Sequence, residues 1–561
     1  MRRFSNPIDI AIGLFIVGLA IVLFKDSPYV YGSERPILDL SPRYLPFYTF
    51  ASLSRMFVAM ILSLLLALLL GYLAAVRERW ARIILPTADI LQSIPVLGFF
   101  PAAVFLFIRL FNNSVVGVEI AAVFLIITSV LWNLIFAVYE SITTVPEDLQ
   151  LVRRQFGIAG YTQWMRVVLP AVLNKLAYNA MISWANGWYF LIACEIIIIG
   201  PIRYQLPGLG SYLAQTMTSG EYQLAIYGLL ALAAVIIFFQ FIIWNPLNEW
   251  STRFVIESGG KHPEHINRSR TSLRFHMARS QLLRAMWYRL IKPTIRGLVS
   301  LVGLVLASER SNRIGIISTV SVIIVIFGLS WGVFTSIDAL ARPAPELSQI
   351  PSALVLSFLR ILVAYVLAMI WTLPLAMFIG QNDRVSRLLL PAIEVLASMP
   401  ATALFPLIVM AILSLGGDMN LASILLVTTG MQWYLLFNLI AGVRAIPGDL
   451  MEISKSLGMT GLTKWRRLVL PALYPSLITG SITAIGGGWN ALVLSEYVVS
   501  EGTVYSVHGI GALLDYATYE SGSLQLIVSS IAAMVIFILI VNRFLWQPAY
   551  HLAQKRFVLN Y

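Results

Sequence analysis

VPEDLQLVRRQFGIAGYTQWMRVVLP occupies residues 145–170, and IPGDLMEISKSLGMTGLTKWRRLVLP occupies residues 446–471, 301 positions further on. Both stretches keep a Pro, an Asp, a Gly, a Trp and a final Leu-Pro at the same spacing. These residues are Pro146, Asp148, Gly157, Trp164, Leu169 and Pro170 in the first stretch, and Pro447, Asp449, Gly458, Trp465, Leu470 and Pro471 in the second. Such ordered matches indicate an internal duplication.

The duplication extends well beyond these stretches. Three prolines of the first half recur 305 positions later in the second, and a Trp and a Glu recur at the 301 spacing. The matched residues are Pro86, Pro95, Pro101, Trp188 and Glu195 with Pro391, Pro400, Pro406, Trp489 and Glu496. We therefore expect two halves of the same fold.

The composition places most of the chain in a membrane. Of the 561 residues, 58% are hydrophobic and 12% are charged, whereas soluble domains are about a quarter charged. Apolar runs long enough to cross a bilayer predict helices near 8–24, 50–76, 86–108, 117–140, 171–199 and 224–244, then near 314–336, 354–380, 391–414, 420–441, 472–499 and 524–545. No small-residue cleavage site follows the run 8–24, so we expect a retained helix rather than a signal peptide.

The predicted fold is an all-α membrane protein with about twelve transmembrane helices in two six-helix repeats. We expect a first unit at 1–250, a basic cytoplasmic linker at 251–312 with an interfacial helix near 286–308, and a second unit at 313–561. A plain solvated linker is the alternative reading of that polar segment.

Lysine and arginine set the predicted orientation because they concentrate in cytoplasmic loops. With the N-terminus inside, 31 of the 39 basic residues fall on the cytoplasmic side. Six spans per half return both halves to the same side, so the halves are parallel repeats with both termini in the cytoplasm. This placement explains the formal charge of +12, and no nucleic-acid partner is expected.

We call residues 145–170 and 446–471 the first and second knuckles. In the second knuckle, Pro447 suits a first helical turn and Asp449 suits its positive end. Gly458 then ends this short helix, Thr463 caps a second short helix, and the proline after Leu470 starts the next membrane helix. Two amphipathic knuckles kept in register predict that a partner docks on both.

The knuckles resemble the coupling motif of ABC importer permeases, written E-A-A, three residues, G, nine residues, I, any residue, L-P. The second fits as Glu452-Ile-Ser, Gly458, Leu468 and Leu470-Pro471; the first fits as Leu151-Val-Arg, Gly157, Val167 and Leu169-Pro170, without the glutamate. Later segments resemble the nitrate, sulfonate, taurine and bicarbonate group of these permeases. They are Gly-Gly-Gly-Trp489-Asn, Ser495-Glu496 and His508-Gly-Ile-Gly511, with Asn186-Gly-Trp188, Cys194-Glu195 and Leu206-Pro-Gly-Leu-Gly210 in the first half.

This resemblance implies two fused permease units of the type I importer fold in a cell membrane. It implies a path for a small solute, such as one of those anions or taurine, which opens by alternating access. It further implies two separate ATPase subunits on the knuckles and an external solute-binding protein. The sequence has no Gly-Lys-Ser/Thr phosphate loop, so no enzymatic activity and no cofactor are expected. The alternatives are an ion- or proton-coupled secondary transporter with parallel repeats, which predicts paired titratable groups at the midplane, and a membrane scaffold.

Six residues in the apolar helices are candidates for the translocation path: Arg55, Trp188, Glu195, Arg360, Trp489 and Glu496. Ionisable groups at membrane depth are costly and therefore often functional. For the glutamates, a structural bond to the loop that follows is equally favoured. For the arginines, snorkelling to lipid headgroups is favoured over anion binding. For the tryptophans, close packing beside glycines is favoured. The single cysteine, Cys194, and the scattered histidines predict no metal site.

Overall fold

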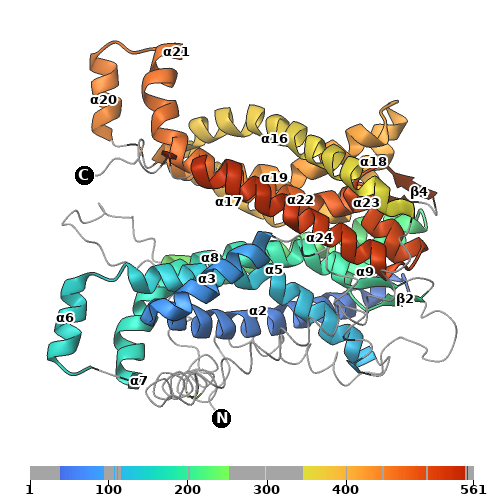
Figure 1. The fold of residues 1–561 in the computed structure, drawn as a ribbon, viewed down its shortest axis with the longest axis horizontal. Helices are drawn as coiled ribbons and strands as arrows, with labels where there is room; N and C mark the ends of the chain where they lie inside the picture. Colours follow the sequence, from blue (N-terminus) through green and yellow to red (C-terminus); the bar gives the residue numbers. More distant parts are fainter. Residues whose placement is uncertain are drawn as a thin grey trace.

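The computed structural model describes residues 38–93, 115–158, 160–199, 202–251, 345–399, 401–444, 448–500 and 503–549, with positions 96, 107, 110, 111, 293, 297, 446, 552 and 553. Two helical bundles lie next to each other, one from the blue-to-green first half and one from the yellow-to-red second half (Figure 1). The expected spans 8–24 and 314–336 lie outside the described residues, as does nearly all of the expected linker.

The two halves repeat one order of elements. The first comprises α2 (Leu45–Val76), α3 (Glu78–Ser93), α5 (Val115–Thr143), α6 (Glu147–Gln155), α7 (Gly160–Gln163), α8 (Leu169–Cys194), β1 (Ile196–Ile199), β2 (Ile202–Gln205), α9 (Leu209–Thr218), α10 (Tyr222–Phe239) and α11 (Asn245–Ser251). The second comprises α16 (Ile350–Gly380), α17 (Asp383–Ser398), α18 (Phe405–Ser414), α19 (Met419–Arg444), α20 (Gly448–Ser456), α21 (Gly461–Lys464), α22 (Leu470–Ser495), β3 (Tyr497–Ser500), β4 (Thr503–Ser506), α23 (Ile510–Asp515) and α24 (Leu524–Val541).

Three long helices form the core of each bundle: α2, α5 and α8 in the first, and α16, α19 and α22 in the second. Small residues let them approach closely. A Cβ on Gly71 would lie 2.7 Å from Val138 Cβ, and one on Gly487 would lie 2.5 Å from the carbonyl oxygen of Gly430. Trp188 and Trp489 are buried in these two cores, which confirms the expectation of close packing around them.

Seven helices among the described residues are long and apolar enough to cross a membrane, or eight if α17 and α18 together form one bent span. They include α2, α5 and α10 in the first half, and α16, α19, α22 and α24 in the second. The protein is therefore a multi-pass integral membrane protein, as its composition predicts.

The expected helices 171–199 and 472–499 are too long at their C-terminal ends. The chain leaves α8 after Cys194 and α22 after Ser495, and it forms an antiparallel hairpin in each half. In the first hairpin Ile196 pairs with Gln205, and in the second Tyr497 pairs with Ser506. β-branched residues such as Ile196–Ile199 suit a strand as well as a buried helix, which is why hydropathy alone placed them in the span.

The expected span 391–414 is not one straight helix. α17 stops at Ser398, a short 3₁₀ turn covers Ala401–Leu404, and α18 begins at Phe405 with Pro406 in its first turn. The two helices meet at an angle of 69°. A proline fixes φ and suits the first turn of a helix, so Pro406 starts a new helix instead of kinking an old one.

The two knuckles lie at one end of the molecule and the two hairpins lie at the other (Figure 1). Each knuckle extends beyond its own bundle. This common polarity is the one expected of parallel repeats.

Candidate functional site

In both knuckles, a glycine after the first short helix adopts the left-handed backbone conformation. Gly157 has a φ of +60° and Gly458 a φ of +65°, and they follow α6 and α20. After α20, the amide of Met459 donates to the carbonyl oxygen of Ser454 at 2.9 Å, which is the bond that closes a Schellman turn. A Cβ on either glycine would meet nothing within 4 Å. The backbone conformation alone therefore favours glycine, and the predicted helix stop is confirmed in both knuckles.

Each knuckle then runs into its core helix without a break. α7 continues through a π-helical turn at Trp164–Val168 into α8, and α21 continues through Trp465–Val469 into α22. One expectation is wrong, since Thr463 lies inside α21 instead of capping it. α22 does begin at Leu470 with the proline in its first turn, as predicted, although it continues the preceding helical turns. The wider π turn accommodates that proline, since its ring would clash with a regular preceding turn.

The knuckles expose polar and apolar side chains together. Asp148, Asp449 and Glu452 are exposed, while Pro447 lies outside the described residues. Two large apolar side chains at equivalent positions are also exposed, Phe156 by 76% and Leu457 by 66%.

The tryptophans face the other way, toward the bundles. The Trp164 ring packs against that of Tyr72, with ring centroids 5.0 Å apart, and Trp465 packs on the buried cluster around Val469. Each knuckle is therefore anchored to its bundle through its tryptophan and keeps a partly apolar tip exposed.

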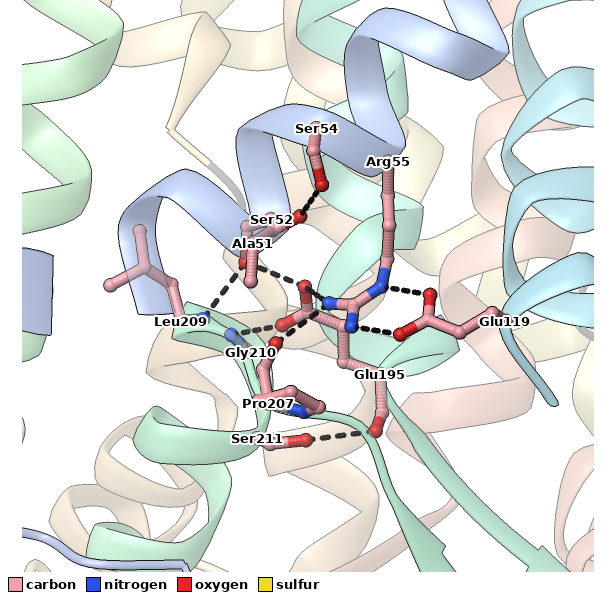
Figure 2. Close-up of polar contacts among 10 residues, drawn as sticks. All are labelled: Ala51, Ser52, Ser54, Arg55, Glu119, Glu195, Pro207, Leu209, Gly210 and Ser211. Carbon is pink, nitrogen blue, oxygen red and sulfur yellow. Dashed lines mark hydrogen bonds and ion pairs between the residues drawn. The ribbon is translucent and has the colours of Figure 1, made fainter. Parts of the chain in front are cut away.

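A buried polar cluster holds the hairpin end of the first half (Figure 2). Arg55 Nη1 donates to Glu195 Oε1 at 2.8 Å and to the carbonyl oxygen of Pro207 at 2.9 Å. Its Nε and Nη2 donate to the two carboxylate oxygens of Glu119 at 2.6 Å each. Glu195 Oε2 accepts the amide of Gly210 at 2.7 Å. The cluster thus joins α2, α5 and the end of α8 to the start of α9.

Ser52, one helical turn before Arg55, completes this cluster. Its hydroxyl donates to Glu195 Oε1 and accepts the amide of Leu209 at 2.9 Å. A Cβ on Gly208 would lie 2.2 Å from the Glu195 carboxylate. Glycine at this position is therefore required for the carboxylate to reach the start of α9.

The second half repeats the cluster with one change. Arg360 Nη1 donates to Glu496 Oε1 at 2.6 Å, and Glu496 Oε2 accepts the amide of Gly511 at 2.8 Å. Ser357 takes the place of Ser52. Where Glu119 meets Arg55, the amide oxygen of Asn420 meets Arg360 Nη2 at 2.8 Å. A neutral amide therefore takes the place of the Glu119 carboxylate beside the arginine of the second cluster.

The two clusters test the alternative interpretations of the charged path candidates. Arg55 and Arg360 are buried and bonded to carboxylates, so the snorkelling interpretation is wrong. Glu195 and Glu496 accept the amides of Gly210 and Gly511, in the first turn of the helix after each hairpin, which favours the structural interpretation over a place in the path. A repeated signal was present in the sequence, since Ser52 and Arg55, like Ser357 and Arg360, are three residues apart and share one helix face.

A cavity of about 340 Å³ lies between the two halves. The first half contributes the middle of α8 with Gln240, and the second half contributes parts of α17, α19 and α22. None of the six path candidates lines this cavity, and their role in the path stays a prediction. The residues that do line it, among them Asn186, Glu394, Tyr434 and Asn490, were not identified from the sequence.

Side chains of the two halves bond to each other at this cavity. Tyr434 donates its hydroxyl to Asn186 Oδ1 at 3.0 Å, and Gln240 Nε2 donates to Glu394 Oε2 at 3.0 Å. The amide of Val96 donates to Asn490 Oδ1 at 2.9 Å. Polar side chains of α8, α17, α19 and α22 thus bond to the opposite half where the bundles touch.

No group of three or more His, Cys, Asp or Glu residues that could hold a metal occurs in the part of the chain that the structure describes. Cys194 is buried at the end of α8.

Comparison with known proteins agrees with this arrangement. The family described as "Binding-protein-dependent transport system inner membrane component" matches the chain twice, at residues 67–244 and 372–547. The chain is 29% identical over 186 residues to a nitrate import permease protein of Leptolyngbya laminosa, covering 33% of this chain and 63% of the relative. It is 28% identical over 192 residues to a bicarbonate transport system permease protein of Synechococcus elongatus, covering 34% and 64%. It is 26% identical over 159 residues to a taurine transport system permease protein of Escherichia coli, covering 28% and 56%.

Each match spans less than two thirds of the relative's own length and about a third of this chain. The two family matches, in contrast, together take up more than half of the chain and fall one in each half. They include both knuckles and the cavity-lining helices. The chain therefore belongs to the family of binding-protein-dependent transport system inner membrane components, and it carries that unit twice.

Proposed function

We propose that this chain forms the whole translocation path of an ATP-driven importer for a small solute. Two separate ATPase subunits dock on the knuckles, and an external binding protein delivers the solute at the hairpin end. One observation carries this proposal: each knuckle is continuous with a helix that lines the cavity between the halves.

This continuity gives the knuckles a mechanical role. The first knuckle runs from Gly160 through α8, whose residues between Tyr178 and Phe190 line the cavity. The second runs from Gly461 through α22, which contributes Gly487 and Asn490. Closure of an ATPase pair would move both knuckles, and rigid helices would transmit that movement to the cavity walls.

The exposed tips support docking. Phe156 and Leu457 are large apolar side chains at the same position of the two knuckles. Exposed apolar groups beside charged ones are typical of protein–protein contact sites. The pair of tips matches a pair of ATPase subunits, one tip to each.

The two family matches support the division into units 1–250 and 313–561 joined by the basic segment 251–312. The excess of Lys and Arg near the knuckles and in that segment supports a cell membrane protein with cytoplasmic termini. We place the Arg55 and Arg360 clusters at the outer end of the path. There they hold the hairpins in position, while Trp188 and Trp489 pack the cores.

A second candidate function is ion-coupled transport. One observation favours it, since Glu394 lines the cavity and carboxylates within membranes often relay ions. Solute accumulation by the purified chain in liposomes under a proton or sodium gradient, without an ATPase, would select this alternative.

A docking experiment tests the importer. We expect Leu457→Asp to lose its ATPase partner on affinity purification, because a charge would replace the apolar tip. The control is Leu415→Asp, since Leu415 is 87% exposed and follows α18, near the hairpin end (Figure 1). Equal ATPase recovery with Leu457→Asp and the wild type would remove the docking role from this knuckle.

A further inference from the structure

The cavity between the halves follows one face of α8 and one face of α19. Its lining positions fall at 178, 181, 185 and 189 on α8, and at 430, 433, 437 and 441 on α19. Spacings of three and four residues keep each set on one side of its helix. The lined stretch of α19 covers three turns, or roughly 16 Å. With a volume of about 340 Å³, the cavity falls within the range that holds small organic ligands, about 300–1,000 Å³.

Aromatic side chains provide much of this lining. Tyr189 comes from α8, and Trp433, Tyr434 and Phe437 come from α19. All four rings are half-buried, whereas Trp188 in the core is fully buried. Part of each ring is therefore left for a solute to cover. Covering apolar surface is favourable, and aromatic rings gain further from packing edge to face or offset against one another.

The side-chain amides of the lining are already bonded to the protein. Besides the bonds between the halves described above, Asn186 and Asn490 donate to the carbonyl oxygens of Ser129 and Gly486 at 3.2 Å and 3.1 Å. A small inorganic anion that leaves water needs several donors in place of its hydration shell. These amides have fewer donors left to offer, so the lining suits an apolar solute better than a small, strongly hydrated one.

The hydroxyl of Tyr189 differs from these amides. Its oxygen is buried and has no hydrogen-bond partner among the described residues. Asn490, at the equivalent position of the second half, both donates and accepts. A buried polar group left unpaired costs free energy and is uncommon. An acceptor oxygen on a bound solute would supply the partner that the Tyr189 hydroxyl lacks.

We propose that this cavity binds a small aromatic solute that carries a hydrogen-bond acceptor, in preference to a small inorganic anion. The inference rests on the proposed function, in which the cavity is part of the path. The rings of Tyr189, Trp433, Tyr434 and Phe437 pack against the aromatic part of the solute, and the Tyr189 hydroxyl donates to its acceptor.

Protection of a cysteine in the cavity wall measures this preference. Ala185 lines the cavity on α8 and is half-buried. In the purified full chain carrying Ala185→Cys, we would measure the rate of modification by methyl methanethiosulfonate, a small neutral reagent. The rate is compared with and without benzamide, an aromatic ring with a carbonyl acceptor. Acetamide, which has the amide without the ring, and sodium nitrate are the matched probes. The wild-type chain, whose single cysteine is buried, gives the background.

We expect benzamide to slow the modification about tenfold when it occupies nine sites in ten, because the reagent then finds the cavity free a tenth of the time. At the same concentration, acetamide and nitrate should change the rate less than about twofold, since neither covers the rings. Ala397→Cys on α17, also in the lining, is the second reporter if Ala185→Cys does not fold.

Three substitutions connect the protection to the lining. Tyr189→Phe keeps the ring and removes one hydrogen bond, so the benzamide concentration for half protection should rise about fivefold. Phe437→Leu keeps an apolar side chain and removes a ring, with a similar expected rise of about fivefold. Phe544→Leu is the control, since this ring is 77% exposed outside the cavity, and it should leave the half-protecting concentration unchanged.

Absence of protection by benzamide, or equal protection by nitrate, would overturn the proposal. Protection that neither Tyr189→Phe nor Phe437→Leu weakens would also overturn it. If the reagent modified neither cysteine, the cavity would be closed to solutes, with the same consequence. Because no ATPase takes part, a failure here leaves the docking experiment on Leu457 to decide the importer by itself.

Discussion

At the scale of single residues, Gly458 shows most clearly how backbone conformation serves the proposed function. The residue has a φ of +65° and open space around its α-carbon. A β-branched side chain would be strained there by about 1–2 kcal/mol or more, and the strain would change the direction of the knuckle.

Gly458→Val should therefore leave the protein inserted in the membrane but abolish solute-stimulated ATP hydrolysis by the assembled complex. Gly458→Asn is the matched control, because asparagine tolerates the left-handed region at helix ends and should retain most of the stimulation. Equal loss in both variants would mean that the knuckle requires something other than a positive φ.

Substitution of Glu195 tests how much the buried cluster contributes to the stability of the chain. Glu195→Ala leaves the Arg55 guanidinium with one carboxylate fewer in a buried site, and breaking such a pair costs about 3–5 kcal/mol. The apparent melting temperature of the chain in detergent should fall by several degrees.

Glu119→Asn is the comparison for this substitution. The Glu119 side chain is 37% exposed, partly exposed pairs contribute at most about 1 kcal/mol, and Asn420 already occupies the equivalent place beside Arg360. A large drop in stability for Glu119→Asn, or none for Glu195→Ala, would contradict the assignment of Glu195 as the centre of the cluster.

The sequence identified Arg55, Glu195 and their counterparts as unusual but did not predict that they pair. Arg55 and Glu195 are 140 positions apart, and apolar periodicity says nothing about contacts at such a separation. The repeated Ser-x-x-Arg on α2 and α16 was visible in the sequence. The amides at the start of α9 and α23, which bond to the serines, are brought close only by folding, so the sequence could not identify them.

At the scale of elements, the core helices were predicted closely and the irregular ones were not. Apolar runs located α2, α5, α16 and α19 because each crosses the membrane as one long segment. The hairpins were missed because Ile196–Ile199 and Tyr497–Ser500 are as apolar as the helices before them, and hydropathy does not separate a strand from a helix. The prolines at 400 and 406 indicated either a bend or a tolerated kink, and the break between α17 and α18 is the bend.

The polarity of these elements gives a topological prediction. Thr503→Cys on β4 and Ser456→Cys at the end of α20 both place a thiol at an exposed position, at opposite ends of the molecule (Figure 1). A membrane-impermeant maleimide applied to intact spheroplasts should label Thr503→Cys only, and Ser456→Cys only after permeabilisation. The reverse pattern would put the knuckles outside and end the docking proposal.

At the scale of the whole molecule, the sequence predicted the duplication but not the difference between the residues that the two halves contribute to the cavity. The matched prolines and glycines predict two similar halves, and both the repeated elements and the double family match agree. However, among the described residues the cavity takes α8 and Gln240 from one half and parts of α17, α19 and α22 from the other. Tyr189 and Asn490 occupy equivalent positions 301 residues apart, and such differences give the chamber a chemistry that a symmetric pore cannot have.

The central claim is that one chain supplies both halves of the pore and both docking sites. The most direct test is the composition of the purified complex, measured by native mass spectrometry after co-expression with its ATPase. We predict one copy of this chain with two copies of the ATPase, because two knuckles on one chain match the two subunits of an ATPase pair. A complex with two copies of this chain, or with a single ATPase on one chain, would contradict the account.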